Sequence, residues 1–371
     1  MTLATSTLRC SYYLVLILSL GRPGIAFPAE TVPASKEAAG AVSDAAKATK
    51  AEWLAKPPGA EPAAHAKSSA GAKQTAEAKA TPAAAAPASK PTEPAVVPEG
   101  ECPENPEPAP NWPRADTYKG MPFQPGEEAR YVLKYGLVKV HVGYGFLRVQ
   151  PPTKHTMPVA KKNGTVISEP RWHRVFTAEA YTGDWYKMIF AGHDKMQAFS
   201  RPWDFGVTKF YMSQDEEKPF VRRYHAEKWL DFDHVTCKVH ERTVDHKKKR
   251  EKTEEHFLQP TADDALGALF KLRTFDWQLN KTERILVYTS EKNWWLEATP
   301  IAVETVKTEV GKHRAYKLTV KTYLGKELQQ RGKLFVWIAA DHPNHPMLRV
   351  EGEVTFGSIY LELDRFTPGA A

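Results

Sequence analysis

Residues 333–366 read KLFVWIAADHPNHPMLRVEGEVTFGSIYLELDRF and show the clearest structural pattern in the chain. Between residues 348 and 356, every second residue is apolar or glycine, and the residues between them are polar. Successive side chains of a β-strand point to opposite faces, so this segment is predicted to be a strand with one buried and one exposed face. Gly357-Ser358 then predicts a tight turn, and the alternation resumes from Ile359. The stretch therefore predicts antiparallel strands in a meander.

The first strand of this meander has a different pattern. Leu334, Val336 and Ile338 alternate with Phe335 and Trp337, so both faces of the strand are apolar. We expect such a strand to be covered on both sides, by a helix or by the contents of a closed barrel. The sequence DHPNHP at residues 341–346 predicts a turn, because proline lacks an amide donor and fixes its own φ.

Most of the region before this stretch is also predicted to form short strands. The predicted segments are residues 129–137, 138–149, 174–181, 185–190, 209–211, 221–229, 234–243, 284–289, 294–298, 301–310 and 315–323. Residues 153–170 are predicted to form a long polar loop. The fold class that follows is all-β and mainly antiparallel, with a curved sheet, barrel or half-barrel.

One helix interrupts the strands. Leu266, Leu269 and Phe270 recur at helical spacing after Thr261, and Thr261 with Asp264 resembles a capping box. We therefore predict a helix that begins at Thr261 and packs on the sheet.

The amino terminus predicts an exported protein. Residues 11–20, SYYLVLILSL, follow Arg9 and form an apolar run too short to span a bilayer, which needs about 20 residues. Small residues at Gly24 and Ala26 suit signal peptidase, so residues 1–26 are predicted to be a signal peptide. The alternative is an uncleaved membrane anchor. We favour cleavage, a location in the periplasm or cell envelope, and no transmembrane span after cleavage.

Residues 27–110 are rich in Ala, Pro, Lys, Glu and Ser and are predicted to be a disordered low-complexity tail. The tail is either a tether that contacts the cell wall or a leader without a specific partner. Residues 111–368 contain nearly all the aromatic side chains and predict a single β-rich domain. A domain of this size can bury a sufficient core without stabilising cross-links.

Charge and motif content exclude several function classes. The chain of 371 residues has a net charge of +7, which permits anionic partners without identifying one. The basic run HKKKREK at residues 246–252 has no interleaved aromatic residue, so it is predicted to be a hairpin tip and no nucleic-acid partner is expected. No nucleophile elbow, zinc-protease motif or phosphate-binding glycine loop is present, so no cofactor and no catalytic residue is predicted.

Four segments resemble the bacterial family catalogued as domain of unknown function 3108. FQPGE at residues 123–127 is similar to the opening of its members, and DDALGALFKLR at 263–273 is similar to their central helix. VETVKTEVG at 303–311 and LFVWI at 334–338 look like the carboxyl half. The resemblance covers residues 121–366. It implies an exported envelope protein with a β-rich, barrel-like fold and no established catalytic residues.

Cysteine and histidine pairs offer two further sites. After export, Cys102 and Cys237 would be the only cysteines, and an oxidising compartment permits a disulfide between them. A buried free thiol at Cys237 is the alternative. His342 and His345 flank a turn where zinc would need further ligands, and no nearby cluster supplies them, so a plain turn is favoured and no metal is predicted.

The domain is also rich in tryptophan, which can line a pocket for an amphiphile or stack on sugar rings. Most of these side chains are expected in the core. Trp294 and Trp295 are adjacent and cannot both face inward on a regular strand. They and Trp185 are the candidate ligand contacts.

These observations favour a non-enzymatic envelope protein that binds an apolar, lipid or glycan ligand or a partner protein. Two alternatives remain open. One is a hydrolase of glycan or cell-wall material that uses paired carboxylates. The other is a structural spacer tethered to the cell wall through residues 27–110.

Overall fold

The computed structural model describes residues 101–370, apart from 104–105, 185–186, 188–190, 219–220, 330–331 and 354–356. In these residues the fold is one large sheet of 16 strands with a single α-helix, α3 (Ala265–Leu272), and a short 3-10 helix, η1 (Arg114–Asp116). All strand pairs are antiparallel except the two-residue pairing of β9 with β10. The predicted all-β class with one packed helix is therefore confirmed.

The strands follow one another closely along the chain. Their bounds are β1 (Glu128–Tyr135), β2 (Val140–Lys162), β3 (Thr165–Thr182), β4 (Ala191–Ser200), β5 (Val207–Lys218), β6 (Val221–Asp233), β7 (Lys238–Asp245), β8 (Arg250–Phe257), β9 (Asp263–Asp264), β10 (Glu283–Thr289), β11 (Lys292–Thr308), β12 (Gly311–Leu324), β13 (Glu327–Leu328), β14 (Leu334–Ala339), β15 (Met347–Glu353) and β16 (Ser358–Thr367).

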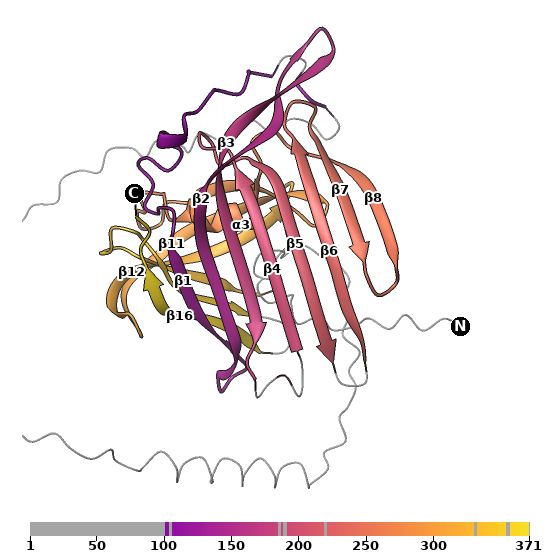
Figure 1. Ribbon diagram of the computed structural model, residues 1–371. Coiled ribbons are helices and arrows are strands. Elements are labelled where there is room, and N and C mark those ends of the chain that lie inside the picture. Colours follow the sequence, from indigo (N-terminus) through magenta and orange to yellow (C-terminus); the bar gives the residue numbers. More distant parts are fainter. Residues whose placement is uncertain are drawn as a thin grey trace, which may run out of the picture. The chain divides into compact units, whose positions relative to one another are not determined.

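The sheet consists of two meanders, which are joined by the first strand of one and the last strand of the other. Strands β1 to β8 pair in chain order, and so do β10, β11, β12, β14, β15 and β16 (Figure 1). The ladder between β1 and β16 connects the meanders, with Tyr131 opposite Leu363. The path of the sheet begins at β8 and ends at β9, so these two ends are not paired with each other. The sheet is therefore open rather than a closed barrel.

The carboxyl-terminal meander follows the predicted alternation. Leu348, Val350 and Gly352 are buried on β15, whereas Arg349 is half-buried and Glu353 is exposed. On β16, Ile359, Leu361 and Leu363 belong to the main hydrophobic core. Residues 354–356 lie outside the described part of the chain, so the alternation predicted there is not tested.

Strand β14 is covered on its second face by cationic side chains rather than by a helix. The Lys317 ammonium lies 4.7 Å from the ring centroid of Phe335 and 5.0 Å from that of Trp337. The Arg349 guanidinium lies 5.6 Å from the Trp337 ring. Long cationic side chains shield aromatic surface with their stems while their heads remain hydrated, and the charge is attracted to the ring face. Such side chains can therefore cover an apolar face that we expected a helix or barrel contents to cover.

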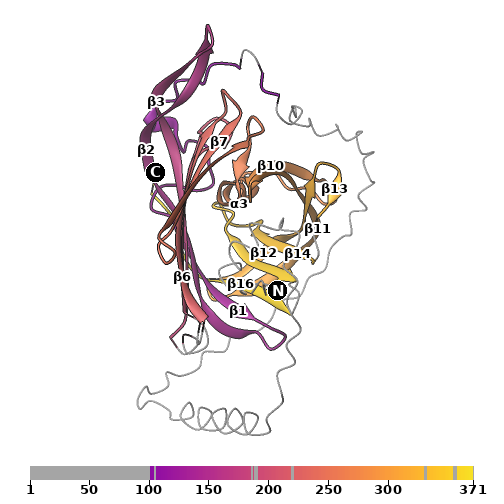
Figure 2. The same ribbon diagram turned by 90° about the vertical axis from the view of Figure 1, so that its right-hand side faces the viewer.

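Helix α3 packs against the inner face of the sheet (Figure 2). The Phe270 ring stacks on Phe176 of β3 with a centroid distance of 4.1 Å, and Phe123 meets Phe270 edge-on at 5.4 Å. Asp264, not Thr261, is the N-cap, and its carboxylate accepts hydrogen bonds from the amides of Leu266 and Gly267. Asp263 and Asp264 form β9, so the helix begins after that strand and the predicted start at Thr261 is wrong.

The predicted loop at residues 153–170 is instead a long hairpin formed by the ends of β2 and β3 (Figure 1). Lys162 pairs with Thr165 across a two-residue turn, Asn163-Gly164, in which φ is 50° and 78°. Asn-Gly is the strongest short sequence signal for such a turn, because both residues adopt positive φ at little cost. The polar composition of the segment led us to overlook this signal.

The described chain includes a covalent bond between its amino-terminal end and the sheet. Cys102 and Cys237 form a disulfide with a Cα–Cα distance of 5.7 Å. Cys237 lies in the turn between β6 and β7 with a positive φ of 58°, so the strand predicted from residue 234 begins later, at Lys238.

Several predictions fall outside the described residues. They are the signal peptide at 1–26, nearly all of the tail at 27–110, and the strand at 185–190 except residue 187. The domain boundary at residue 111 remains a prediction. Within the described residues, no helix has the length and apolar character needed to cross a membrane.

Candidate functional site

A cavity of about 290 Å³ lies between the inner face of β4–β8 and the segment formed by β9, α3 and β10. The two unpaired ends of the sheet are β8 and β9, and we call the gap between them the seam. The cavity lies in this seam. Its apolar lining comes from β4, β5, β6 and α3, and consists of Met196, Phe210, Met212, Leu230, Phe232 and Leu266. The even-numbered residues of β5 face this cavity because the strand alternates its faces.

Two polar groups on the cavity wall are buried without a hydrogen-bond partner in the described structure. They are the Tyr288 hydroxyl and Asp264 Oδ2, on side chains that are 3% exposed in both residues. The two residues are opposite each other in the short β9–β10 ladder. A buried polar group without a partner costs about 1–3 kcal/mol. This pair is therefore the natural place for a polar group of a ligand, or for water, to bind.

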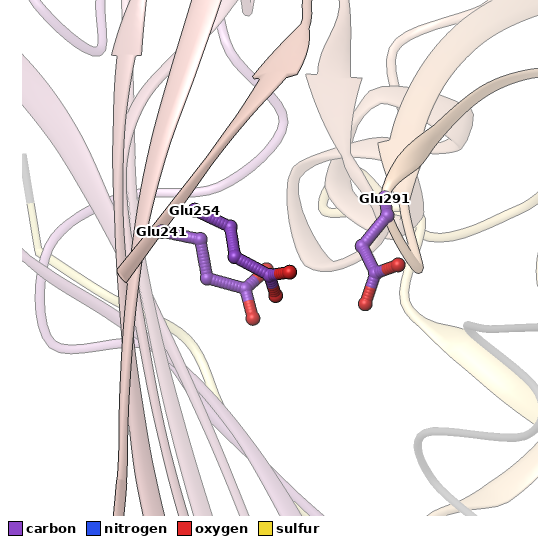
Figure 3. A group of neighbouring side chains, drawn as sticks. All are labelled: Glu241, Glu254 and Glu291. Carbon is purple, nitrogen blue, oxygen red and sulfur yellow. The ribbon is translucent and has the colours of Figure 1, made fainter. Parts of the chain in front are cut away.

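Three carboxylates from both sides of the seam meet at the cavity. Glu241 on β7 is directly opposite Glu254 on β8, and Glu291 comes from the turn between β10 and β11 (Figure 3). One carboxylate oxygen from each lies within 4.8 Å of the others. We call these residues the seam triad. Burial of the Tyr288 phenol raises its pKa, and the nearby charges of the triad raise this pKa further.

Two lysines partly neutralise the seam triad. The Lys228 ammonium lies 2.5 Å from Glu241 Oε1, and the Lys252 ammonium contacts Glu254 Oε1. The Lys252 contact lowers the pKa of Glu254, so this carboxyl is charged at neutral pH. Because two ammonium groups face three carboxylates, the local charge of these five groups remains negative.

The carboxyl group with the most altered proton affinity in the cavity wall is that of Asp264. Burial raises its pKa to about 6, although the amides of Gly267 and Leu266 oppose the rise. Its Oδ1 already accepts both amides, so the group is committed to capping α3. Glu254, whose pKa is lowered, is a poor general acid. The cavity wall therefore combines one carboxyl group of raised pKa, which caps α3 through Oδ1, with an ionised carboxylate at Glu254.

Of the tryptophans named from the sequence, Trp294 and Trp295 do not line this cavity. Trp294 is 3% exposed, and its indole N–H donates to the Thr289 carbonyl, so it is a core residue. Trp295 is half-buried and packs against the smaller hydrophobic cluster that includes Leu286 and Tyr288. The two side chains thus differ in burial, as adjacent residues on a strand should. Trp185 lies outside the described residues.

The turn that contains His342 and His345 is held by hydrogen bonds to backbone groups. The His345 ring contacts the Arg273 carbonyl, and the His342 ring accepts from the Asn344 amide. The Arg273 side chain in turn donates to the carbonyls of Asn344 and His345 and forms a bidentate pair with buried Glu127.

The family model described as protein of unknown function (DUF3108) matches residues 130–364, more than half of the chain. The chain belongs to the DUF3108 family. The resemblance inferred from the sequence motifs is therefore confirmed.

Two solved structures resemble this DUF3108 protein at low identity. A β-barrel-like protein of domain of unknown function DUF1849 from Brucella abortus is 9% identical, with a TM-score of 0.41, over 66% of this chain and 98% of that chain. A protein of YmcC-like fold from Bacteroides fragilis, described as exported, is 12% identical, with a TM-score of 0.28, over 67% and 98%. No curated protein matches the chain.

Proposed function

We propose that this DUF3108 protein is an exported, non-enzymatic envelope protein that binds an amphiphilic ligand in the seam cavity. The observation that carries the proposal is the combination of an apolar floor with two buried, unpartnered oxygen groups on Asp264 and Tyr288. Ligand pockets typically have this composition, with apolar walls and a few polar groups that fix orientation.

The size of the cavity limits the ligand. A volume of about 290 Å³ is at the small end of ligand pockets, which span roughly 300–1,000 Å³. It accommodates one short chain or ring of a lipid, with the polar part of the ligand at Tyr288 and the seam triad. A bulky folded partner does not fit there.

The proposed location rests on two features of the chain. The apolar run at residues 11–20 suits a signal peptide, and the disulfide between Cys102 and Cys237 suits an oxidising compartment. A glycan or protein ligand and a wall-tethering role for the tail are alternatives, but no feature of the seam cavity favours them.

Binding of a fluorescent apolar probe tests the proposal. The full chain, stripped of lipid, is titrated with N-phenyl-1-naphthylamine and then with medium-chain alcohols and amines as competitors, because the negative seam triad repels a carboxylate head. Met212→Trp places a large side chain in the cavity, so we expect at least a tenfold loss of probe affinity. Ser213→Trp adds the same side chain to the other face of β5 and should bind the probe like the wild type.

Circular dichroism and thermal unfolding establish that both variants are folded before affinities are compared. Native mass spectrometry of protein isolated from the cell envelope should show a bound small amphiphile. Equal probe affinity of wild type and Met212→Trp, or saturable binding by neither the wild type nor Ser213→Trp, contradicts the proposal.

A further inference from the structure

The seam triad places like charges where the fold alone would disfavour them. Glu241 and Glu254 are directly opposite each other on adjacent antiparallel strands, an arrangement that is destabilising by itself. Glu241 is only 4% exposed, so water screens its charge poorly. A third carboxylate, Glu291, approaches from the other end of the sheet (Figure 3).

The surrounding lysines do not use all the carboxylate oxygens. Lys228 and Thr243 contact Oε1 of Glu241, and Lys252 contacts Oε1 of Glu254. Among the described residues, these partners use only the Oε1 atoms, so the Oε2 atoms of the two glutamates can bind a further cation. The His256 ring nitrogen lies 3.8 Å from Glu241 Oε2, beyond hydrogen-bond distance.

Tyr288 provides a second and independent indication of a ligand. Its side chain lines the same cavity as the triad, is buried, and has a hydroxyl without a partner in the described structure. The hydroxyl oxygen is a neutral ligand for a hard cation, and its proton can be donated to a metal-bound water. Burial without a partner would otherwise cost about 1–3 kcal/mol.

From these contacts we infer that the seam triad binds a divalent cation, with calcium as the best fit. Calcium takes six to eight oxygen ligands in flexible geometry, and carboxylates supply them in either monodentate or bidentate form. The three glutamates and the Tyr288 hydroxyl account for part of this number, and water completes it. Magnesium requires near-ideal octahedral geometry, which a site assembled from two sheet ends does not impose.

The position of the site gives the cation a structural consequence. Glu241 and Glu254 belong to the β7–β8 end of the sheet, whereas Glu291 belongs to the β10–β11 hairpin near the other end. A cation held by all three bridges the seam, across which β8 and β9 form no strand ladder in the described residues. The bridge would narrow the mouth of the cavity, but cation binding itself needs no amphiphile. The inference therefore goes beyond the proposed function and can be tested without it.

The test uses the full chain, stripped of lipid and treated with chelator, and measures thermal unfolding as calcium chloride is added. With two lysines nearby, we expect a dissociation constant on the order of 10⁻⁴–10⁻³ M. Calcium at 10 mM should then raise Tm by about 3 °C. Magnesium at the same concentration and ionic strength should raise it less.

Two matched variants distinguish calcium binding at the seam triad from non-specific screening of surface charges by the added salt. Glu291→Gln removes the charge that crosses the seam and should abolish the calcium-dependent rise in Tm. Glu255→Gln removes a neighbouring exposed charge on β8 that pairs with Lys238 on the other face, so it should keep the rise.

Terbium luminescence provides a measurement that does not depend on stability. Tyrosine excitation should sensitise bound terbium in the wild type and in Glu255→Gln, and added calcium should quench the emission. Glu291→Gln should lose most of this calcium-sensitive emission. An unchanged Tm with calcium, or equal responses of the two variants in both assays, would overturn the inference.

Discussion

At the scale of single residues, buried charges decide where the structure is sensitive. Asp264 has two tasks: it caps α3, and it lies in the wall of the seam cavity. Glu127 and Arg273 form a bidentate pair with nitrogen–oxygen distances of 2.6 and 3.0 Å, and both side chains are almost fully buried. The contribution of each group to the free energy of unfolding can be measured by comparing two substitutions, either at the same position or at a neighbouring exposed one.

The raised pKa of Asp264 predicts a pH-dependent contribution to stability. Its pKa is about 6 in the folded chain against 3.8 for an unperturbed group, so the folded state binds more protons between these values. The contribution of this group therefore falls as pH rises from about 4 to about 6 and stays low above that, a loss of roughly 2 kcal/mol. Buried Asp263 and Lys271 also belong to this charged environment.

Asp264→Asn keeps an oxygen acceptor for the helix amides and removes the charge, so at pH 8 it should be at least as stable as the wild type. Asp264→Ala loses the cap and should be less stable than Asp264→Asn by about 1 kcal/mol. Urea unfolding at pH 5 and pH 8 measures both differences. A larger loss for Asp264→Asn at pH 8 than at pH 5 would contradict the assigned direction.

Removal of one partner from the Glu127–Arg273 pair should be strongly destabilising. Glu127→Gln leaves a buried guanidinium without its counterion, and we expect a loss of about 3–5 kcal/mol in the free energy of unfolding. Glu128→Gln affects an ion pair with Arg148 that is partly exposed and should cost no more than about 1 kcal/mol. Chemical denaturation of both variants makes the comparison, and similar losses would count against the importance of burial.

At the scale of elements, the hairpins and the helix follow local rules that can be read from the sequence. The alternation on β15 and β16 predicted their buried faces, and the spacing of Leu266, Leu269 and Phe270 predicted α3. The start of α3 could not be predicted from the capping pattern, because β9 uses Asp263 and Asp264 as strand residues that pair with β10. This pairing depends on segments more than 20 residues apart, which a local pattern does not contain.

The long β2–β3 hairpin predicts a local effect at its turn. Gly164 has a φ of 78°, and a Cβ added there would meet no atom within 4 Å, so Gly164→Ala suffers only from the backbone conformation, at a cost of about 1 kcal/mol. Amide hydrogen exchange should become faster near the turn, in residues 158–169. Amides of β11 and β12 serve as the internal control and should keep their protection; an equal change in both regions would show that the effect is global.

At the scale of the whole molecule, the site is a product of topology. The seam triad comes from β7, β8 and the β10–β11 turn, and only the order of the strands brings these segments together. The turn that carries Glu291 consists of Ser290 and Glu291 with φ of 51° and 66°, without the Asn-Gly signal that usually indicates such a turn. Sequence reasoning therefore favoured conspicuous tryptophans and missed scattered glutamates.

The disulfide predicts a large effect of reduction on global stability. Cys102 and Cys237 are 135 residues apart, and in the loop-entropy model a cross-link of that span contributes at most about 5 kcal/mol. Cys102→Ser should therefore lower the midpoint of urea unfolding, and reduction of the wild type should lower it similarly. Mass mapping of peptides under non-reducing conditions identifies the bond. A free Cys237 thiol in protein from the envelope would support the alternative of a buried cysteine.

The ladder between β1 and β16 has a consequence for how the chain reaches its folded state. It pairs Glu128 with Thr367, which are 239 positions apart (367 − 128), whereas most other pairings are between consecutive strands. Until the last ten-residue strand is available, β1 and β15 each present an unpaired edge that can recruit a second molecule. A nascent or truncated chain that stops before Ser358 should therefore depend on a holding chaperone. This dependence should end when the final strand pairs with β1 and β15 and covers both edges.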